Sequence, residues 1–273
     1  ILKYAKKRNF IVCVHAEDDF VILRNSAKHK NLKAGDHDKI RSAEAEAEAV
    51  KKLLALQAKT KCRMHFCHLS SEFGVKLIAS AKKKSKAITA EVTPHHLFLT
   101  NTDVKKLGNF AKVNPSIKSE KDRKALWNGI FNGAIDVIAT DHAPHTIAEK
   151  RKPYALAPSG LPGVETMLPL LLDAMHKEKI SINEIQALCS TNPAKFFGLK
   201  NKGEIKNGFD ADLVVVDVMA ERKIENKKLL TKCRWSPWNG KRLKGAVEKT
   251  ILAGNVVFDN GKVIGKPEGK GVI

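Results

Sequence analysis

The chain has 273 residues, of which 43% are hydrophobic, and carries a formal net charge of +20 from 49 Lys and Arg against 29 Asp and Glu. This length allows one large domain, or a large and a small one, with a substantial core. The lysines are scattered and aromatic residues make up only 6%, so the charge predicts a solvated surface and no nucleic-acid partner.

No apolar run approaches the ~18 residues of a membrane span, so no membrane partner is expected. The five cysteines are odd in number and form no C-x-x-C pair. The first residues do not resemble a signal peptide. Together these features predict a reducing, cytoplasmic compartment.

Four short apolar runs of buried-strand type alternate with helical patterns in the first half of the chain. The runs are 10–14, 64–67, 87–93 and 135–140, and the main helices expected between them are 41–60, 73–83 and 120–131. Strands alternating with helices predict an α/β fold with a parallel sheet. Four units do not close an eight-stranded barrel, so the sheet is either small and doubly wound or half of a barrel.

The pattern changes after the fourth strand. A long loop with Pro and Gly covers 143–162, and helices follow over 164–176 and up to Gly198. From Gly203 onward, short β-branched runs are joined by Gly254-Asn255 and Asn260-Gly261 turns, which indicates a small antiparallel segment. We therefore expect two domains, 1–202 and 203–273.

Three chemically capable side chains follow predicted strands: His15, His68 and Asp141. A lone histidine at such a position is more often a hydrogen-bonded structural residue, and that alternative stays open. Imidazole nitrogens and a carboxylate oxygen are nevertheless ligands of catalytic Zn²⁺, which lowers the pKa of bound water towards ~7. Asp141 would then carry the proton. The residues alone predict a metal-dependent hydrolase site at the C-terminal edge of a parallel sheet.

Several motifs together identify a family resemblance. They are H-A-E-D-D (15–19), H-F-C-H-L-S-S (65–71), E-V-T-P-H-H-L (91–97), K-V-N-P-S-I-K (112–118), A-T-D-H-A-P-H (139–145), G-L-P-G-V-E-T (160–166), S-T-N-P-A-K-F-F-G-L (190–199) and N-G-F-D-A-D-L-V-V-V-D (207–217). In this order they resemble the dihydroorotases, cyclic amidases of the amidohydrolase superfamily. The related allantoinases and hydantoinases usually lack the last His of A-T-D-H-A-P-H.

The resemblance implies a partial (β/α)₈ TIM-type barrel, with strands five to eight present here, and a small C-terminal β domain. It implies one or two zinc ions and the reversible interconversion of N-carbamoyl-aspartate and dihydroorotate in pyrimidine biosynthesis. In that reaction a metal-bound hydroxide attacks the ring amide carbonyl. By position, His15 and His68 would bind the second metal. Asp141 would bind the first metal and shuttle the proton.

The resemblance also implies a substrate site. His145 would hold the substrate carboxylate, Asn114 would face the ring, and the backbone at Pro162 and Gly163 would bind the ring amide. The neighbouring pair His95-His96 is expected to be structural. The expected partners are the small-molecule substrate, a second copy in a homodimer, and aspartate transcarbamoylase.

The family's H-x-H-x-R motif of strand one, its substrate-binding Asn and its metal-bridging residue have no counterpart in this sequence. The chain opens without Met inside a helical pattern. We therefore expect a C-terminal portion that is incomplete by itself. Two alternatives remain: another cyclic amidase of the allantoinase or hydantoinase type, and a non-catalytic dihydroorotase-like partner of aspartate transcarbamoylase.

Overall fold

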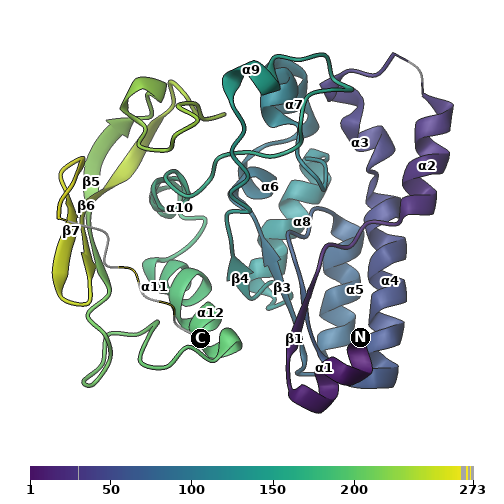
Figure 1. Cartoon of the computed structure of the whole chain (residues 1–273), viewed down its shortest axis with the longest axis horizontal. Helices are drawn as coiled ribbons and strands as arrows, with labels where there is room; N and C mark the ends of the chain where they lie inside the picture. Colours follow the sequence, from purple (N-terminus) through teal and green to yellow (C-terminus); the bar gives the residue numbers. More distant parts are fainter. Residues whose placement is uncertain (30, 266–268, 270, 272–273) are drawn as a thin grey trace. The chain divides into compact units, whose positions relative to one another are not determined.

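A four-stranded parallel sheet organises the first of two compact units, which comprises residues 1–164 and 231–237 of the computed structural model (Figure 1). The strands are β1 (Ile11–Val14), β2 (Arg63–Phe66), β3 (Ile88–Val92) and β4 (Val137–Ile138), and they lie in chain order across the sheet. The structure describes residues 1–29, 31–265, 269 and 271. The predicted parallel α/β arrangement is confirmed.

The helices of the first unit connect these strands. They are α1 (Leu2–Arg8), α2 (Asp19–Lys28), η1 (Ala34–Asp36), α3 (His37–Ile40), α4 (Ala43–Thr60), α5 (Glu72–Lys82), α6 (Pro94–Phe98), α7 (Asn101–Leu107), η2 (Gly108–Ala111), α8 (Glu120–Phe131) and α9 (Ile147–Lys150). The long helices α4, α5 and α8 begin after Ser42, Ser71 and Ser119. Each of these side chains accepts a backbone N–H of the first turn, so local capping determines where each helix starts.

The two faces of the parallel sheet differ in chemistry. Met64, Phe66 and Ala90 point to one face and are fully buried, and α4, α5 and α8 lie side by side along the sheet (Figure 1). The alternate residues of the strands, among them His65 and Glu91, form a polar second face. Parallel sheets are normally buried on both faces, so polar side chains such as His65 and Glu91 on the second face are unusual.

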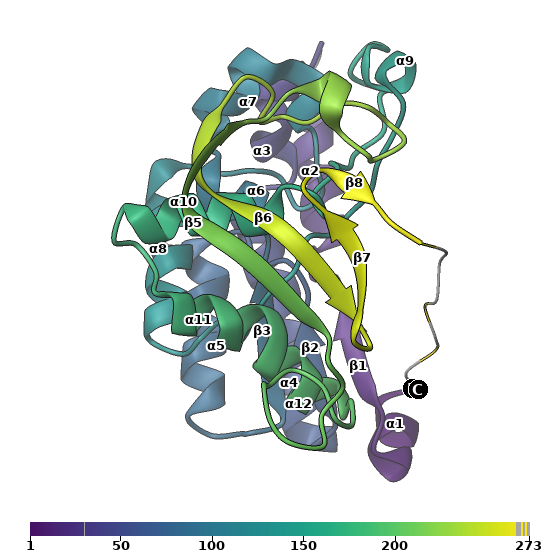
Figure 2. The same ribbon diagram turned by 90° about the vertical axis from the view of Figure 1, so that its left-hand side faces the viewer.

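The second unit comprises residues 165–230 and the described residues from 238 onward. An antiparallel sheet, shown in Figure 2, contains β5 (Leu213–Lys223), β6 (Arg242–Leu252), β7 (Asn255–Asp259) and β8 (Lys262–Val263). Its helical segments are α10 (Met167–His176), α11 (Ile182–Gln186), η3 (Ala187–Thr191), α12 (Asn192–Phe197) and η4 (Asn226–Lys228). The predicted C-terminal antiparallel segment is confirmed, with turns at Gly254 and Gly261 between its strands.

The compact units do not coincide with the predicted domains. Helices α10 to α12 group with the antiparallel sheet, because α10 packs on β6: a Cβ placed at Gly245 would lie 2.4 Å from Leu172 Cβ. The predicted boundary between residues 202 and 203 separates the barrel of a complete protein from its C-terminal β domain, and it stays a prediction. Among the described residues, no helix combines the length and the apolar character that crossing a bilayer requires.

Candidate metal and substrate site

The structure brings His15 and His68 together at the C-terminal ends of β1 and β2. His15 Nδ1 lies 3.1 Å from His68 Nε2, and the two rings meet edge to face with their centroids 4.8 Å apart. Two nitrogen ligands at ~2.0–2.1 Å from a tetrahedral zinc ion are separated by roughly 3.3 Å. The spacing of this pair therefore fits two ligands of one zinc ion.

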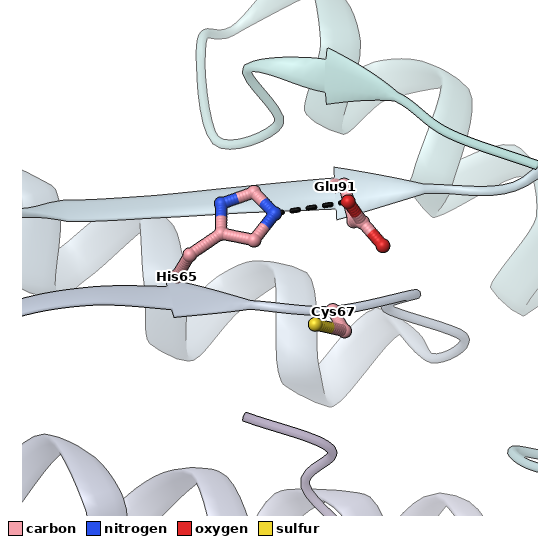
Figure 3. A group of neighbouring side chains, drawn as sticks. All are labelled: His65, Cys67 and Glu91. Carbon is pink, nitrogen blue, oxygen red and sulfur yellow. Dashed lines mark hydrogen bonds and ion pairs between the residues drawn. The ribbon is translucent and has the colours of Figure 1, made fainter. Parts of the chain in front are cut away.

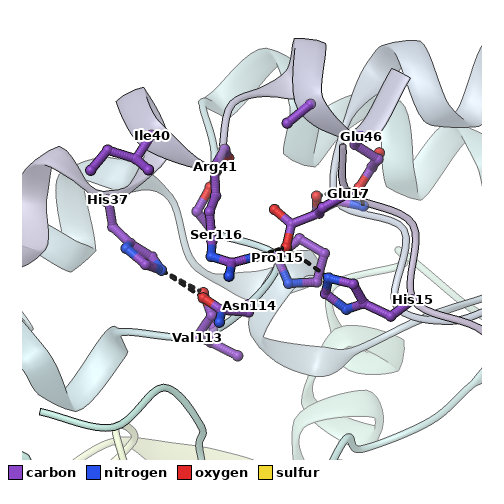
Figure 4. A network of polar contacts seen from close by, with 12 residues as sticks. His15, Glu17, His37, Ile40, Arg41, Glu46, Val113, Asn114, Pro115 and Ser116 are labelled. Atoms are coloured by element: carbon purple, nitrogen blue, oxygen red, sulfur yellow. Dashed lines mark hydrogen bonds and ion pairs between the residues drawn. The ribbon is translucent and has the colours of Figure 1, made fainter. Parts of the chain in front are cut away.

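A buried carboxylate orients the His15 ring. Its Nε2 lies 2.9 Å from Glu17 Oε2, and the same oxygen forms an ion pair with Arg41 (Figure 4). Burial raises the pKa of Glu17, but the hydrogen bond to His15 and the charge of Arg41 outweigh this and the net pKa is lowered. An ionised Glu17 favours the His15 tautomer with the proton on Nε2. His15 Nδ1 then accepts the hydrogen bond from His68 Nε2 in this structure, and it is the nitrogen that would bind a metal.

Buried His68, like buried His95, has one ring nitrogen without a hydrogen-bond partner among the described residues. Buried His96 uses both ring nitrogens: its Nδ1 lies 2.8 Å from Thr93 Oγ1 and its Nε2 lies 3.0 Å from the Pro115 carbonyl oxygen. His68 is buried, yet its Nδ1 has no hydrogen-bond partner among the described residues. Burial, and next the neighbouring His15, lower the pKa of His68, which keeps the ring neutral as metal binding requires.

Asp141 follows β4 and shares the same edge of the sheet. Its backbone has φ +44°, a left-handed conformation, and His68 has φ +36°. The Asp141 carboxylate acts electrostatically on His68, where it opposes the lowering of the pKa. Asp141 and His68 therefore lie within electrostatic range of each other at this edge, and a zinc site that joins both to His15 stays a prediction.

A second group of potential ligands lies on the polar face of the sheet. The ligand atoms of His65, Cys67 and Glu91 lie within 4.8 Å of one another (Figure 3). Burial, and next the charge of Glu91, raise the pKa of the Cys67 thiol to about 12, so without a metal ion the thiol stays protonated.

Glu91 also forms hydrogen bonds with His65 and with the backbone of His68. One oxygen lies 3.0 Å from His65 Nε2, and the other accepts the backbone N–H of His68 at 3.3 Å. Sequence reasoning assigned no role to Glu17 or Glu91, although both stand in the motifs 15–19 and 91–97. Nothing local in the sequence indicates that Arg41 reaches Glu17.

Asn114 lies in a hydrogen-bonded group with His37. The amide oxygen of Asn114 accepts a hydrogen bond from His37 Nε2 at 2.8 Å (Figure 4). His37 Nδ1 lies 2.7 Å from the Tyr154 hydroxyl. Burial lowers the pKa of His37 to about 4, so this ring is neutral near pH 7. The contact between Asn114 and a substrate ring stays a prediction.

The segment 143–163 holds the other predicted substrate residues. His145 Nε2 donates to the Ser159 carbonyl oxygen at 3.1 Å, and the Gly163 backbone N–H donates to His142 Nδ1 at 3.1 Å. Pro162 is buried next to this N–H. In this structure these groups form hydrogen bonds within the segment. A substrate carboxylate or amide would have to replace these bonds, so the substrate-binding roles of His145, Pro162 and Gly163 stay predictions.

Comparisons with known proteins show what the chain is similar to. The model of the Amidohydrolase family matches residues 1–257. The chain is 41% identical to a dihydroorotase of Pyrococcus horikoshii over 98% of its own length and 59% of that protein. It is 39% identical to a dihydroorotase of Halobacterium salinarum over 95% of its length and 60% of that protein. The chain thus spans about 60% of the length of these relatives.

Solved structures match as well. An L-hydantoinase (dihydropyrimidinase) from Arthrobacter aurescens superposes with a TM-score of 0.91 at 28% identity, covering 97% of this chain and 61% of that one. A dihydropyrimidinase from Brevibacillus agri gives a TM-score of 0.90 at 28% identity, covering 96% and 60%. The shared fold therefore extends over both units of this chain.

Proposed function

Because the chain belongs to the amidohydrolase family, we propose that it forms the C-terminal part of a zinc-dependent dihydroorotase. In this proposal β1 to β4 are strands five to eight of a (β/α)₈ barrel, and the other half of the barrel packs against the polar face of the sheet. The whole protein interconverts N-carbamoyl-aspartate and dihydroorotate in pyrimidine biosynthesis.

The observation that carries this proposal is the facing pair of ring nitrogens on His15 and His68, 3.1 Å apart at the edge of a parallel sheet. An edge formed by the C-terminal ends of parallel strands is where barrels of this type place their chemistry. The identity of 38–41% to seven dihydroorotases, over nearly the whole chain, supports this substrate class.

The proposal assigns a role to each residue of the site. His15 and His68 hold one zinc ion, and Asp141 contributes to a first metal and moves a proton between the attacking water and the leaving ring nitrogen. Zinc, when bound, supplies a water of lowered pKa and polarises the amide carbonyl. His145 binds the substrate carboxylate, while Asn114 and the Gly163 backbone N–H hold the ring.

The alternatives are weaker on specific observations. Hydantoinases share the fold, but the identity to the solved ones is 25–29%, below that to the dihydroorotases. A non-catalytic partner of aspartate transcarbamoylase would have no need for the ligand set His15, His68 and Asp141. Association with that enzyme, or with a second copy, remains a prediction compatible with either role.

The test uses the full-length gene product, purified with its metal. We expect bound zinc and activity on dihydroorotate, with little on hydantoin or allantoin. His68→Asn should remove most of the activity and reduce the zinc content, whereas His29→Asn, on a described residue outside the site, should change neither. Turnover of hydantoin in preference to dihydroorotate would show that the proposed substrate is wrong. A His68→Asn variant that keeps its activity and its zinc would refute the metal-binding role of His68.

A further inference from the structure

Two lysine ammonium groups are buried beside the segment 143–163, which carries the predicted substrate residues. Lys150 is 1% exposed, and its Nζ donates to the carbonyl oxygens of Lys112 at 3.2 Å, Pro158 at 2.9 Å and Gly160 at 3.0 Å. Lys112 is 8% exposed, and its Nζ donates to the carbonyl oxygens of Tyr154 at 2.7 Å and Ala157 at 2.6 Å. Every one of these acceptors is a backbone oxygen.

Placing these two charges inside the unit is costly. Burial, and next the charge of Lys112, lower the pKa of Lys150 to about 8. The nearby acid Glu149 is hydrogen-bonded to Thr146 and does not pair with Lys150 in the structure. Carbonyl dipoles offset the cost, and the Tyr154 ring, 4.4 Å from Lys112 Nζ, adds a cation–π contact. A buried ammonium coordinated by carbonyl oxygens fixes the backbone that supplies them.

The backbone fixed in this way is the one that presents the substrate residues. The oxygens bonded to the two lysines belong to residues 154–160, together with residue 112 itself. Within that stretch Ser159 accepts the hydrogen bond of His145, and the Gly160 N–H donates to the Lys112 carbonyl oxygen at 3.0 Å. Gly160 has φ +142°, so the chain there takes a conformation that only glycine adopts readily.

We propose that Lys112 and Lys150 are positioning residues that clamp the segment 143–163 and hold His145 and the Gly163 backbone ready for the substrate. The clamp determines substrate affinity and contacts neither the metal nor the reacting atoms. This proposal rests on the proposed function, since it assigns the segment to substrate binding. The rigidity of the segment, however, can be measured without any substrate.

The first test is hydrogen–deuterium exchange on the full-length wild-type protein. A clamped segment should protect the amides of Gly160 and its neighbours as strongly as amides of β2 and β3. Rapid exchange throughout 143–163 in the wild type would overturn the proposal. This readout requires no activity, so it decides the clamp even if dihydroorotate proves not to be the substrate.

The second test compares Lys150→Met with Lys152→Met, an equal change at an exposed lysine two residues away. The expected result is a KM raised about 10- to 100-fold in Lys150→Met, with unchanged zinc content and faster exchange confined to 143–163. Lys150→Arg, which keeps the charge, should recover part of the loss. Lys152→Met should resemble the wild type.

A merely structural role would give a different result. It would lower the amount of active enzyme, seen as a smaller kcat, and leave KM and the exchange pattern of the folded fraction unchanged. That result, or an unchanged KM in a folded Lys150→Met, would overturn the proposal. If Lys150→Met does not fold, the same measurements on Lys112→Met replace it, because Lys112 bonds two of the five carbonyl oxygens.

Discussion

Replacement of Glu46 by Gln should destabilise the first unit strongly. Glu46 lies on α4, is 1% exposed, and accepts the backbone N–H groups of Ser70 at 2.9 Å and Ser71 at 3.0 Å. Both serine hydroxyls donate to the same carboxylate, and Lys118 Nζ donates to Ser70 Oγ at 2.6 Å. Burial raises the pKa of Glu46, although Lys118 and the serines act in the opposite direction.

The magnitude follows from the hydrogen bonds that are lost. Glutamine has nearly the same shape, but its NH₂ group faces the donors of one serine, so one backbone N–H and one hydroxyl lose their acceptor. An unsatisfied buried donor costs about 1–3 kcal/mol. We therefore expect a loss of about 2–4 kcal/mol in the free energy of unfolding. Glu44→Gln, on the exposed side of the same helix, should stay within about 0.5 kcal/mol.

The assay is urea unfolding of the full-length wild type and both variants at pH 7, followed by zinc titration of the folded proteins. Ser70 stands two residues after His68, so loss of its acceptor should also weaken zinc binding about 10- to 100-fold, as removal of supporting hydrogen bonds commonly does. If Glu46→Gln and Glu44→Gln unfold at the same urea concentration, the carboxylate does not hold this turn and the reasoning is wrong.

Three further outcomes are expected. The pKa of His37 is lowered to about 4, so between pH 6.5 and 4 the unfolded chain binds a proton that the folded chain does not. The free energy of unfolding should therefore fall on acidification by up to ~3 kcal/mol. His37→Gln should flatten this part of a plot of the free energy of unfolding against pH, and an unaltered slope would contradict the prediction. In Gly160→Ala the new Cβ would lie 2.6 Å from the Ala143 carbonyl oxygen, so kcat/KM should fall while zinc content, measured by metal analysis, is retained. In Gly245→Ala the new Cβ would meet Leu172 Cβ at 2.4 Å, which should lower the stability of the second unit by about 2–4 kcal/mol; calorimetry showing no lowered transition would refute this.

Much of the fold was predictable from the sequence because local patterns of apolar residues are periodic. The runs 10–14, 64–67 and 87–93 became β1, β2 and β3, since short apolar runs next to helical patterns have few other solutions. Because parallel strands bring their C-terminal ends together, the same reasoning placed His15 near His68, and the structure joins them at 3.1 Å. The turns at Gly254 and Gly261 between the C-terminal strands were also predictable, because the turn residues are neighbours in the sequence.

Long-range pairings were not predictable in this way. Arg41 reaches Glu17 across 24 residues and Glu46 reaches Ser70 across the same number, and no spacing rule links such positions. No helix was predicted between 93 and 120, yet the structure has α7 and η2 there, because short helices leave little periodic signal. The buried lysines 112 and 150 looked like ordinary surface charge, since the carbonyl oxygens that accept from them come from the backbone, which sequence patterns do not reveal.

The strand order of the parallel sheet has a consequence for how the chain folds. Each strand pairs with the strand that precedes it in the sequence, so no pairing skips over another strand. A single helix, α5, connects β2 and β3, whereas several helices connect β1 with β2 and β3 with β4. Paired residues are 52 positions apart for β1 and β2, 24 for β2 and β3, and 46 for β3 and β4. The entropic cost of closing a loop grows only slowly with its length, so none of these steps is prohibitive. The sheet can therefore grow by addition of one strand–helix unit at a time during synthesis, from β1 towards β4, without waiting for distant segments.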